Sequence, residues 1–542
     1  MYSRLGYFAV KAETTENTPV IPDVFLGIIG IDIVTQYLAN ASSPIYMDRN
    51  TKINPVKGKI DAPQGTVRVQ IEPKGFGYFL KGVFGAVSSG RYFPIVHRLS
   101  TASFTGTPVA GATLLQATTL ATATVNTVNT LSLDVRSITV GFNSTNVVTG
   151  TNPDGTTFTF TPSATLPVPN WTVGETVTGV TSSATAAIVA VSDENDYLIM
   201  GSPTGVFTAA GENLTGGTSS SKAVLGVNAG TVYGHQFKAP QTTLPTFTVE
   251  VGYDDMAFRF TGVRFPAINS LTQEDNILTA ELAMFARAEY KHATIMGAVA
   301  SGAGTKTILL DQTLGLVATD TVKIWRPSTQ SFIDFASSGV KTHTIGTVVP
   351  NTSITVTNLQ VNIVAGDLLV LGPRTPSYST AKEMAWIGGS VARVGDTMVS
   401  TVAASPNLAQ IESFELAVTN EVEGRHAALA SGIAGRFPAK NHLKGFMGNG
   451  TLRRAYLDQN FLNRLRNTTK TSLQVAHTSD QIGTTGVYYQ LDWRLPNCIF
   501  QPWQPPMDTD ALLDEEMPFD FYRETSPAYT AKALLVTDVT TY

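Results

Sequence analysis

Gly65-Thr66-Val67-Arg68 recurs much later in the chain as Gly450-Thr451-Leu452-Arg453, at a shift of 450 − 65 = 385 residues. Further residues match at the same shift: Phe76 with Phe461, Leu80 with Leu465 and Lys81 with Arg466. A repeat constrains the whole fold, because each copy must form a similar unit. The chain is therefore expected to contain one domain twice.

A second set of anchors matches at a shift of 230 residues. The matched residues are Phe258, Arg264, Phe265 and Pro266 with Tyr488, Arg494, Leu495 and Pro496. The two shifts differ by 385 − 230 = 155 residues, so the first copy must contain about that much additional chain between Lys81 and Phe258.

Composition favours a β-rich chain with a large core. Of the 542 residues 43% are hydrophobic and 15% are charged, where about 25% charged residues is usual. Such a length predicts roughly three or four domains. Thr, Ser, Val and Gly together with 28 prolines favour many short strands and turns. The net charge of −5 argues against tight binding to nucleic-acid phosphates.

A single cysteine, Cys498, cannot form an internal disulfide, which excludes the disulfide-stapled secreted class. The apolar run from Val24 to Val34 contains Asp32 and is shorter than the roughly 20 residues of a membrane span. Residues 1–16 lack the pattern of a signal peptide. We expect a soluble protein.

Each copy is expected to contain a strand followed by a helix. In the first copy, Gly65 to Ile71 alternates with a period of two, and Phe76 to Phe84 has apolar residues at helical spacing. In the second copy, Asp458 can cap a helix that buries Phe461, Leu462 and Leu465. The first copy resumes with the strands Phe247 to Val251 and Ala257 to Phe260, joined by a turn at Asp254-Asp255.

The additional chain contains its own repeat, in which Gly174-Glu175-Thr176-Val177-Thr178-Gly179 returns as Gly211-Glu212-Asn213-Leu214-Thr215-Gly216. Each unit predicts a hairpin that continues into Ala186 to Ile188 or Ala223 to Leu225. A third small β unit repeats Leu316 to Val322 as Ile363 to Leu369. The expected division places copy one in 1–96 and 237–296, the inserted module in 97–236, the small unit in 297–373 and copy two in 374–542.

No residue constellation predicts catalysis, a cofactor or a metal. The histidines at positions 97, 235, 292, 343, 426, 442 and 477 include no pair at metal-ligand spacing. No phosphate loop, nucleophile elbow or dinucleotide fingerprint is present. We therefore expect no catalytic, cofactor-binding or metal-binding residues.

Several charged or aromatic groups have a structural and a functional interpretation. The acidic cluster Asp508, Asp510, Asp514, Glu515 and Glu516 lacks the glycine of a calcium loop and predicts a solvated loop. The pairs Asp254-Asp255 and Glu274-Asp275 predict a hairpin tip and a solvated edge rather than acid/base catalysis on a glycan. Trp171, Trp325 and Trp503 predict core or interface anchors rather than sugar platforms. Arg453, Arg454, Arg464 and Arg466 predict a salt-bridging face between subunits.

Ile60 to Val83 resembles the front half of the tail tube proteins of long-tailed bacteriophages. Thr246-Phe-Thr-Val-Glu-Val-Gly-Tyr-Asp-Asp, with Phe258 to Arg264 and Ala280 to Ala288, is similar to that family's back half. The Gly-Glu-Thr-Val-Thr-Gly units are similar to decorative β modules on phage tail proteins.

The resemblance implies two tail-tube β-sandwich domains, each with a flanking helix, plus small β modules. It further implies a structural virion protein, not an enzyme: three chains form a pseudo-sixfold ring around a β-barrel channel, and rings stack into a tube that conducts DNA during ejection. The implied partners are other copies of the chain, a tape-measure protein, a terminator and baseplate or distal tail proteins, and the implied location is the virion tail. DNA is expected to pass without specific binding along a neutral or negative wall, with carboxylates such as Glu250 or Glu281 as candidates to face it.

Two other functions remain open at this point. One is a distal-tail or baseplate ring component, which shares the tube-like fold. The other is a host-surface glycan-binding tail protein in which 97–236 and 297–373 bind the glycan.

Overall fold

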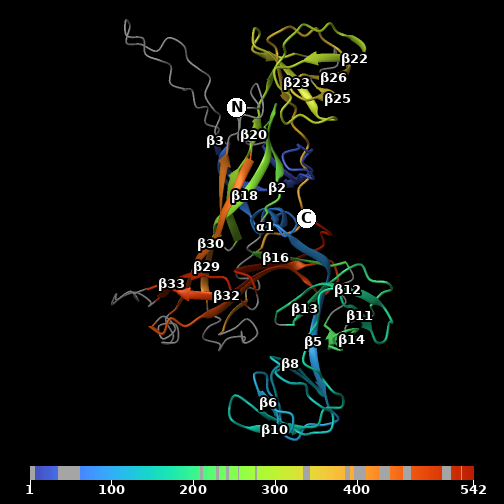
Figure 1. The fold of residues 1–542 in the computed structure, drawn as a ribbon, viewed down its shortest axis with the longest axis vertical. Coiled ribbons are helices and arrows are strands. Elements are labelled where there is room, and N and C mark those ends of the chain that lie inside the picture. The colour runs from blue at the N-terminus through green and yellow to red at the C-terminus, as the bar shows by residue number, and fades with distance from the viewer. Residues whose placement is uncertain are drawn as a thin grey trace. The chain divides into compact units, whose positions relative to one another are not determined.

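The computed structural model describes residues 6–34, 62–193, 195–207, 211–226, 231–239, 243–253, 255–274, 277–333, 342–384, 391–395, 411–425, 440–455, 466–502, 514–525 and 528–542. Within these ranges the chain forms 34 β-strands and one α-helix, α1 (Phe76–Phe84) (Figure 1). The expected mainly β class is confirmed.

The chain divides into two compact units that interleave along the sequence. Unit 1 comprises Met1–Gly85, Gln241–Glu383 and Ser413–Thr451, and unit 2 comprises Ala86–Pro240, Met384–Glu412 and Leu452–Tyr542. Each unit therefore combines three stretches that are separate in the sequence.

The main sheet of unit 1 contains antiparallel strands in the order β3, β4, β19, β18 and β29. Their bounds are β3 (Ile28–Val34), β4 (Gln64–Gln70), β19 (Ile277–Phe285), β18 (Ala257–Glu274) and β29 (Ile411–Arg425). The first part of β18 also pairs with β17 (Phe247–Gly252), and β17 pairs with β1 (Tyr7–Ala12), which in turn pairs with β2 (Val24–Leu26). Strand β30 (Lys440–Ala455) follows β29 and pairs with it.

Strand β4 and helix α1 form where the sequence predicts them. Val67, Val69 and Ile71 are buried while Arg68 between them is exposed, as a half-buried strand requires. The apolar stripe of α1 is buried, and Phe79 packs edge-on against Phe265 with ring centroids 4.9 Å apart. The helix therefore covers the buried face of the sheet.

The predicted turn between Phe247 to Val251 and Ala257 to Phe260 is confirmed as the turn of the β17–β18 hairpin. The amide of Tyr253 donates to the carbonyl of Met256 at 2.8 Å. Asp254 lies outside the described residues, whereas Asp255 is exposed and contacts Lys323.

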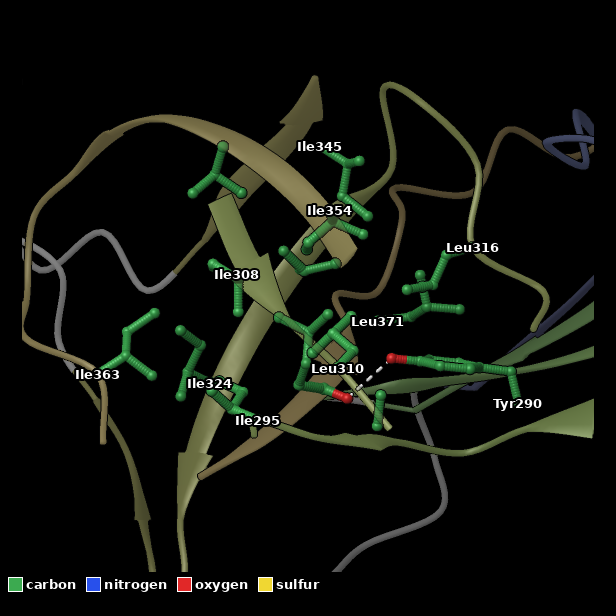
Figure 2. Close-up of a cluster of buried hydrophobic side chains, with 14 of the residues drawn as sticks. Tyr290, Ile295, Ile308, Leu310, Leu316, Ile324, Ile345, Ile354, Ile363 and Leu371 are labelled. Carbon is green, nitrogen blue, oxygen red and sulfur yellow. Dashed lines mark hydrogen bonds between the residues drawn. The ribbon is translucent and has the colours of Figure 1, made fainter. Parts of the chain in front are cut away.

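Residues 293–371 form a small β module on top of β18 and β20 (Ala288–Tyr290). Its strands are β21 (Ala293–Thr294), β22 (Gly302–Leu309), β23 (Thr321–Arg326), β24 (Ser331–Phe332), β25 (His343–Val349), β26 (Ser353–Leu359) and β27 (Leu368–Leu371). Isoleucines and leucines from these strands enclose one core, where the Tyr290 hydroxyl donates to the carbonyl of Leu369 at 2.9 Å (Figure 2).

The repeat predicted within this module is also a structural repeat. Asp320 and Asp367 are both buried, and each accepts a hydrogen bond from the backbone amide three residues earlier. The preceding residues, Thr319 and Gly366, both have positive φ values, 72° and 92°. The strands that follow, β23 and β27, pair with each other, so the two repeat units lie side by side in one sheet.

The main sheet of unit 2 has the strand order β5, β16, β34, β32, β31 and β28. Their bounds are β5 (Val87–Ser100), β16 (Tyr233–Ala239), β34 (Ala531–Thr537), β32 (Tyr488–Phe500), β31 (Thr471–Gln481) and β28 (Val391–Gly395), and β33 (Asp514–Phe521) pairs with the end of β32. Strands flanking the inserted stretch thus share a sheet with strands of the second copy.

The stretch 97–236 contains two hydrophobic cores instead of one. The first is built from β6 (Thr113–Gln116), β7 (Ala121–Asn129), β8 (Ser132–Arg136), β9 (Val148–Thr151) and β10 (Thr157–Phe160). The second is built from β11 (Thr176–Gly179), β12 (Thr185–Val191), β13 (Tyr197–Met200), β14 (Asn213–Gly216) and β15 (Lys222–Leu225). Strand β5 is long enough to contribute to both cores.

The two predicted hairpins of this stretch are confirmed as β11–β12 and β14–β15. They pair with each other through β11 and β14. The Glu175 carboxylate accepts the amide of Ser219 at 2.9 Å, and the Glu212 carboxylate accepts the amide of Ser182 at 2.8 Å. Because 212 − 175 and 219 − 182 both equal 37, each repeat uses its glutamate to hold the turn of the other.

The strand pairings around the two sets of anchors are the same. The pairs β1–β17, β17–β18, β18–β20, β3–β4 and β4–β19 correspond to β28–β31, β31–β32, β32–β34, β29–β30 and β30–β33. Val251 lies opposite Phe258, and the residues 230 positions later, Gln481 and Tyr488, also lie opposite each other. The helix expected at Phe461 to Leu465 lies outside the described residues.

Candidate functional site

Four of the histidines that the structure describes are buried or half-buried within the fold. His235 lies between the Ser89 hydroxyl and the carbonyl of Val539, each 2.8 Å from a ring nitrogen, and burial lowers its pKa to about 4. Burial lowers the pKa of His477 to about 3 and also lowers the pKa of His97 and His343. His292 is exposed, while the side chains of His426 and His442 lie outside the described residues.

The described ranges contain no group of three or more His, Cys, Asp or Glu side chains placed to hold a metal ion. Cys498 is buried, and burial raises the pKa of its thiol. No helix within the described ranges is long and apolar enough to cross a membrane.

The tryptophans do not form open platforms where the structure describes them. Trp171 is buried in the second core of 97–236, and Trp325 packs edge-on against Phe332 with ring centroids 5.1 Å apart. Trp503 lies outside the described residues. Trp171 and Trp325 are thus packing residues.

The charged groups singled out in the sequence are only partly described. Of the acidic cluster, Glu516 on β33 is exposed, whereas Asp508 and Asp510 and the side chains of Asp514 and Glu515 lie outside the description. The same holds for Asp275 and for the side chain of Glu274. Arg453 contacts Glu412 at 3.6 Å and Arg466 is exposed, while Arg464 and the side chain of Arg454 are not described.

A buried charge cluster joins the small module to the sheet of unit 1. The Arg259 guanidinium contacts Glu250 and Asp320, each at 2.6 Å, and all three side chains are almost fully buried. Arg374 reaches the same two carboxylates at 3.0 and 2.9 Å, and Tyr7 donates to Glu250. Burial by itself lowers the pKa of Arg259, but its hydrogen bonds and charge pairing with Asp320 and Glu250 outweigh burial and raise that pKa.

This cluster corrects one of the two expectations about the channel wall. Glu250 is 1% exposed and is bound by arginines, so it cannot line a channel. Glu281 remains a candidate, because it is partly exposed on β19 and accepts a hydrogen bond from Asn269 at 3.2 Å. The expectation for Glu250 is wrong because β17 is buried on both faces, so neither set of its alternating side chains meets solvent.

A second buried cluster lies in unit 2. Asp193 accepts hydrogen bonds from Lys532 and from Tyr529, and Arg494 contacts Asp492 at 2.7 Å and Asp196 at 3.2 Å. Burial raises the pKa of Asp193, but the nearby Lys532 ammonium outweighs burial and lowers that pKa to about 2. The turn that carries Asp193 and Asp196 thereby docks on the sheet.

Strands β18 and β29 pair in unit 1 although they lie far apart in the sequence. Leu271 lies opposite Leu416, and Ile268 lies opposite Val418. This pairing joins a strand of the expected first copy of the repeat to a strand of the expected second copy. Phe414, Leu416 and Val418 on β29 are buried.

Strand β3 is the counterpart of β29 in the first copy of the repeat, but no described strand pairs with it in the way that β18 pairs with β29. At the shift of 385, Ile29, Ile31 and Ile33 match Phe414, Leu416 and Val418. Ile29 is 46% exposed, and Ile31 and Ile33 are half-buried. Among the described strands β3 pairs with β4 alone, so its other edge is open.

On strands β3, β4, β19 and β29 most of the exposed charged side chains are acidic. They include Asp32, Arg68, Glu281, Glu415, Glu421 and Glu423, all exposed or half-exposed. Five of these six are carboxylates, which gives these four strands a negative charge, whereas the neighbouring β30 contributes the exposed Arg453.

No known protein family matches the chain, and no curated protein matches it either.

Proposed function

We propose that the chain is a structural subunit of a phage tail tube, in which three copies close into a pseudo-sixfold ring and rings stack into a channel for DNA. The observation that carries the proposal is the β18–β29 pairing, because it connects a strand of the first copy of the repeat edge to edge with a strand of the second copy within one chain. An edge-to-edge contact between unlike edges is heterologous, and when repeated between chains it generates a ring if the rotation from one chain to the next closes.

The open edge of β3 supports the same geometry. It presents Ile29, Ile31 and Ile33, whose counterparts on β29 are buried by neighbouring strands. An exposed edge with half-exposed isoleucines is an aggregation hazard unless another strand covers it. We infer that the end of β32 from another chain provides that cover, since β32 has the place in the second copy of the repeat that β18 has in the first.

The negative sheet face suits a conduit. Lys and Arg side chains on a channel wall would bind DNA phosphates and slow passage, whereas carboxylates repel them. The excess of Glu and Asp on the exposed face around Glu281 therefore supports a wall that DNA passes without being held. In this proposal the chain acts in the virion tail and has no catalytic role.

Electron microscopy of the purified full-length protein tests the proposal. Hollow filaments with three chains in each ring are the expected result. Single rings that never stack would favour a distal-tail or baseplate ring component, and a protein that stays monomeric at high concentration would refute the ring.

A further inference from the structure

A cleft of about 310 Å³ lies between the two cores of the stretch 97–236. Strand β15 pairs with β5 at Leu225 and Val224, opposite Ile95 and Val96. From His97 onward β5 pairs with β8 instead and leaves β15. The two strands therefore diverge, and the cleft opens at their fork.

The lining of the cleft is polar at the rim and apolar at the floor. Ser100, Thr165 and Asn213 are exposed and contribute two hydroxyls and an amide. Leu166, Ala223 and Val224 are buried beneath them. The volume lies at the lower end of the range for small-molecule sites, about 300–1,000 Å³.

Positive charge is concentrated in this cleft. The stretch 97–236 contains three Lys or Arg residues, Arg98, Arg136 and Lys222, and two of them line the cleft. Lys222 is exposed, and no carboxylate within the described residues is ion-paired with it. Its backbone carbonyl is held by the His97 ring at 2.9 Å, which fixes the position from which the ammonium extends.

Arg98 supplies the second cation in a fixed orientation. Asp134 binds Nε and Nη2 of Arg98 at 2.6 and 3.1 Å, which orients the guanidinium and balances part of its charge. Together the cation of Lys222 and the Arg98–Asp134 pair leave the cleft with a net charge of about +1. A ligand with one carboxylate would satisfy that charge.

We propose that this cleft binds an acidic saccharide, with its carboxylate at Lys222 and its hydroxyls at Ser100, Thr165 and Asn213. An inorganic anion would fill a small part of the volume and leave the rim hydroxyls unused. A neutral sugar would leave the Lys222 charge unmatched. The inference concerns the outer β cores only and does not depend on the tube proposal.

Titration calorimetry of the full-length protein with cellobiouronic acid, a disaccharide with one carboxylate, tests the site, with cellobiose and inorganic phosphate as comparison ligands. We expect cellobiouronic acid to bind about tenfold more tightly than either, because one charge-assisted contact is worth roughly that factor. Lys222→Gln should weaken binding at least about fivefold. Arg136→Gln, which removes the basic residue outside the cleft, should leave affinity within about twofold, as expected for a distant site.

Unchanged thermal unfolding midpoints would show that both variants are folded. The site is refuted if cellobiouronic acid does not bind, or if Lys222→Gln and Arg136→Gln bind it equally well. Equal affinity for cellobiose would refute the role of the carboxylate, and equal affinity for phosphate would refute the saccharide. Loss of the cleft would leave filament formation intact, so failure here is distinct from failure of the tube.

Discussion

The Arg259 guanidinium and the Asp320 carboxylate lie 2.6 Å apart, and neither side chain is exposed to solvent. Arg259 belongs to the sheet of unit 1 and Asp320 to the small module, so the pair fixes one to the other. Removal of one partner from a buried pair leaves an uncompensated charge, which costs more than the pair itself contributes.

We expect Arg259→Met to destabilise unit 1 by about 3–5 kcal/mol, because Glu250 and Asp320 lose the cation between them. Urea unfolding followed by intrinsic fluorescence measures the change. The matched control is Lys11→Met, which removes an exposed pair with Asp23 and should cost less than about 1 kcal/mol. Equal costs for the two variants would contradict the structural role of the cluster.

Unit 2 should lose stability on acidification through Asp193. Its folded-state pKa of about 2 lies below the ordinary value of 3.8, so its contribution is present above pH 4 and is lost as the pH falls toward 2. The shift corresponds to about 2 kcal/mol. Asp193→Asn should abolish this part of the acid dependence and lower stability at pH 7, because Lys532 loses its counterion. A wild-type acid slope in the variant would count against the pairing.

His235 should act over a different pH window. Its folded-state pKa of about 4 lies below the ordinary 6.5, so the unfolded chain binds a proton before the folded chain does. Stability should therefore fall by about 3 kcal/mol between pH 6.5 and pH 4. His235→Gln should flatten this window, measured as the unfolding midpoint in urea at each pH, whereas replacing the exposed His292 should not. A steep slope that survives in His235→Gln would show that another group is responsible.

A disulfide can test the proposed ring contact. Leu271 and Leu416 lie opposite each other within one chain. By the repeat shifts, Leu271 corresponds to Gln501 (271 + 230) and Leu416 corresponds to Ile31 (416 − 385). Gln501 of one chain is therefore expected to lie opposite Ile31 of the next chain. Directly opposed residues of antiparallel strands have Cα atoms about 4.5–5.5 Å apart, within the range of a disulfide. The double variant Ile31→Cys with Gln501→Cys should form disulfide-linked dimers and trimers under mild oxidation.

The single variants control this experiment, since neither can extend beyond a symmetric dimer. The native thiol of Cys498 is buried and its pKa is raised, so it should stay unreactive. Linked species in the double variant that match those of the single variants would argue against the proposed pairing. If filaments form but no disulfide links the chains, the tube proposal stands and the contact between β3 and β32 of neighbouring chains is wrong.

Features formed by residues close together in the sequence could be predicted well. The α1 stripe, the alternation around Val67 and the Glu175 and Glu212 hairpins follow from periodicity and turn composition, which are local. Val251 lies opposite Phe258, and Gln481 lies opposite Tyr488. Both partners differ by the same 230 residues, so the repeat in the sequence also predicts the register of these strands.

The buried charge clusters, and the chain segments that combine to form unit 2, could not be predicted in the same way. The cluster around Arg259 contains Tyr7, Glu250, Asp320 and Arg374. These residues lie far apart in the sequence, so no local sequence pattern predicts that they meet. The only available signal was a charged residue between Phe258 and Phe260 in a chain with few charges. The sharing of one sheet by β16 and β34 is likewise invisible to periodicity.

The pairing of β16 with β34 has a consequence for synthesis on the ribosome. Tyr233 and Thr537 are paired although 537 − 233 = 304 residues separate them. At roughly 5–20 residues per second, β16 leaves the ribosome about 15–60 s before its partner strand exists. The nascent chain must therefore keep this edge of β16 from other chains for that time.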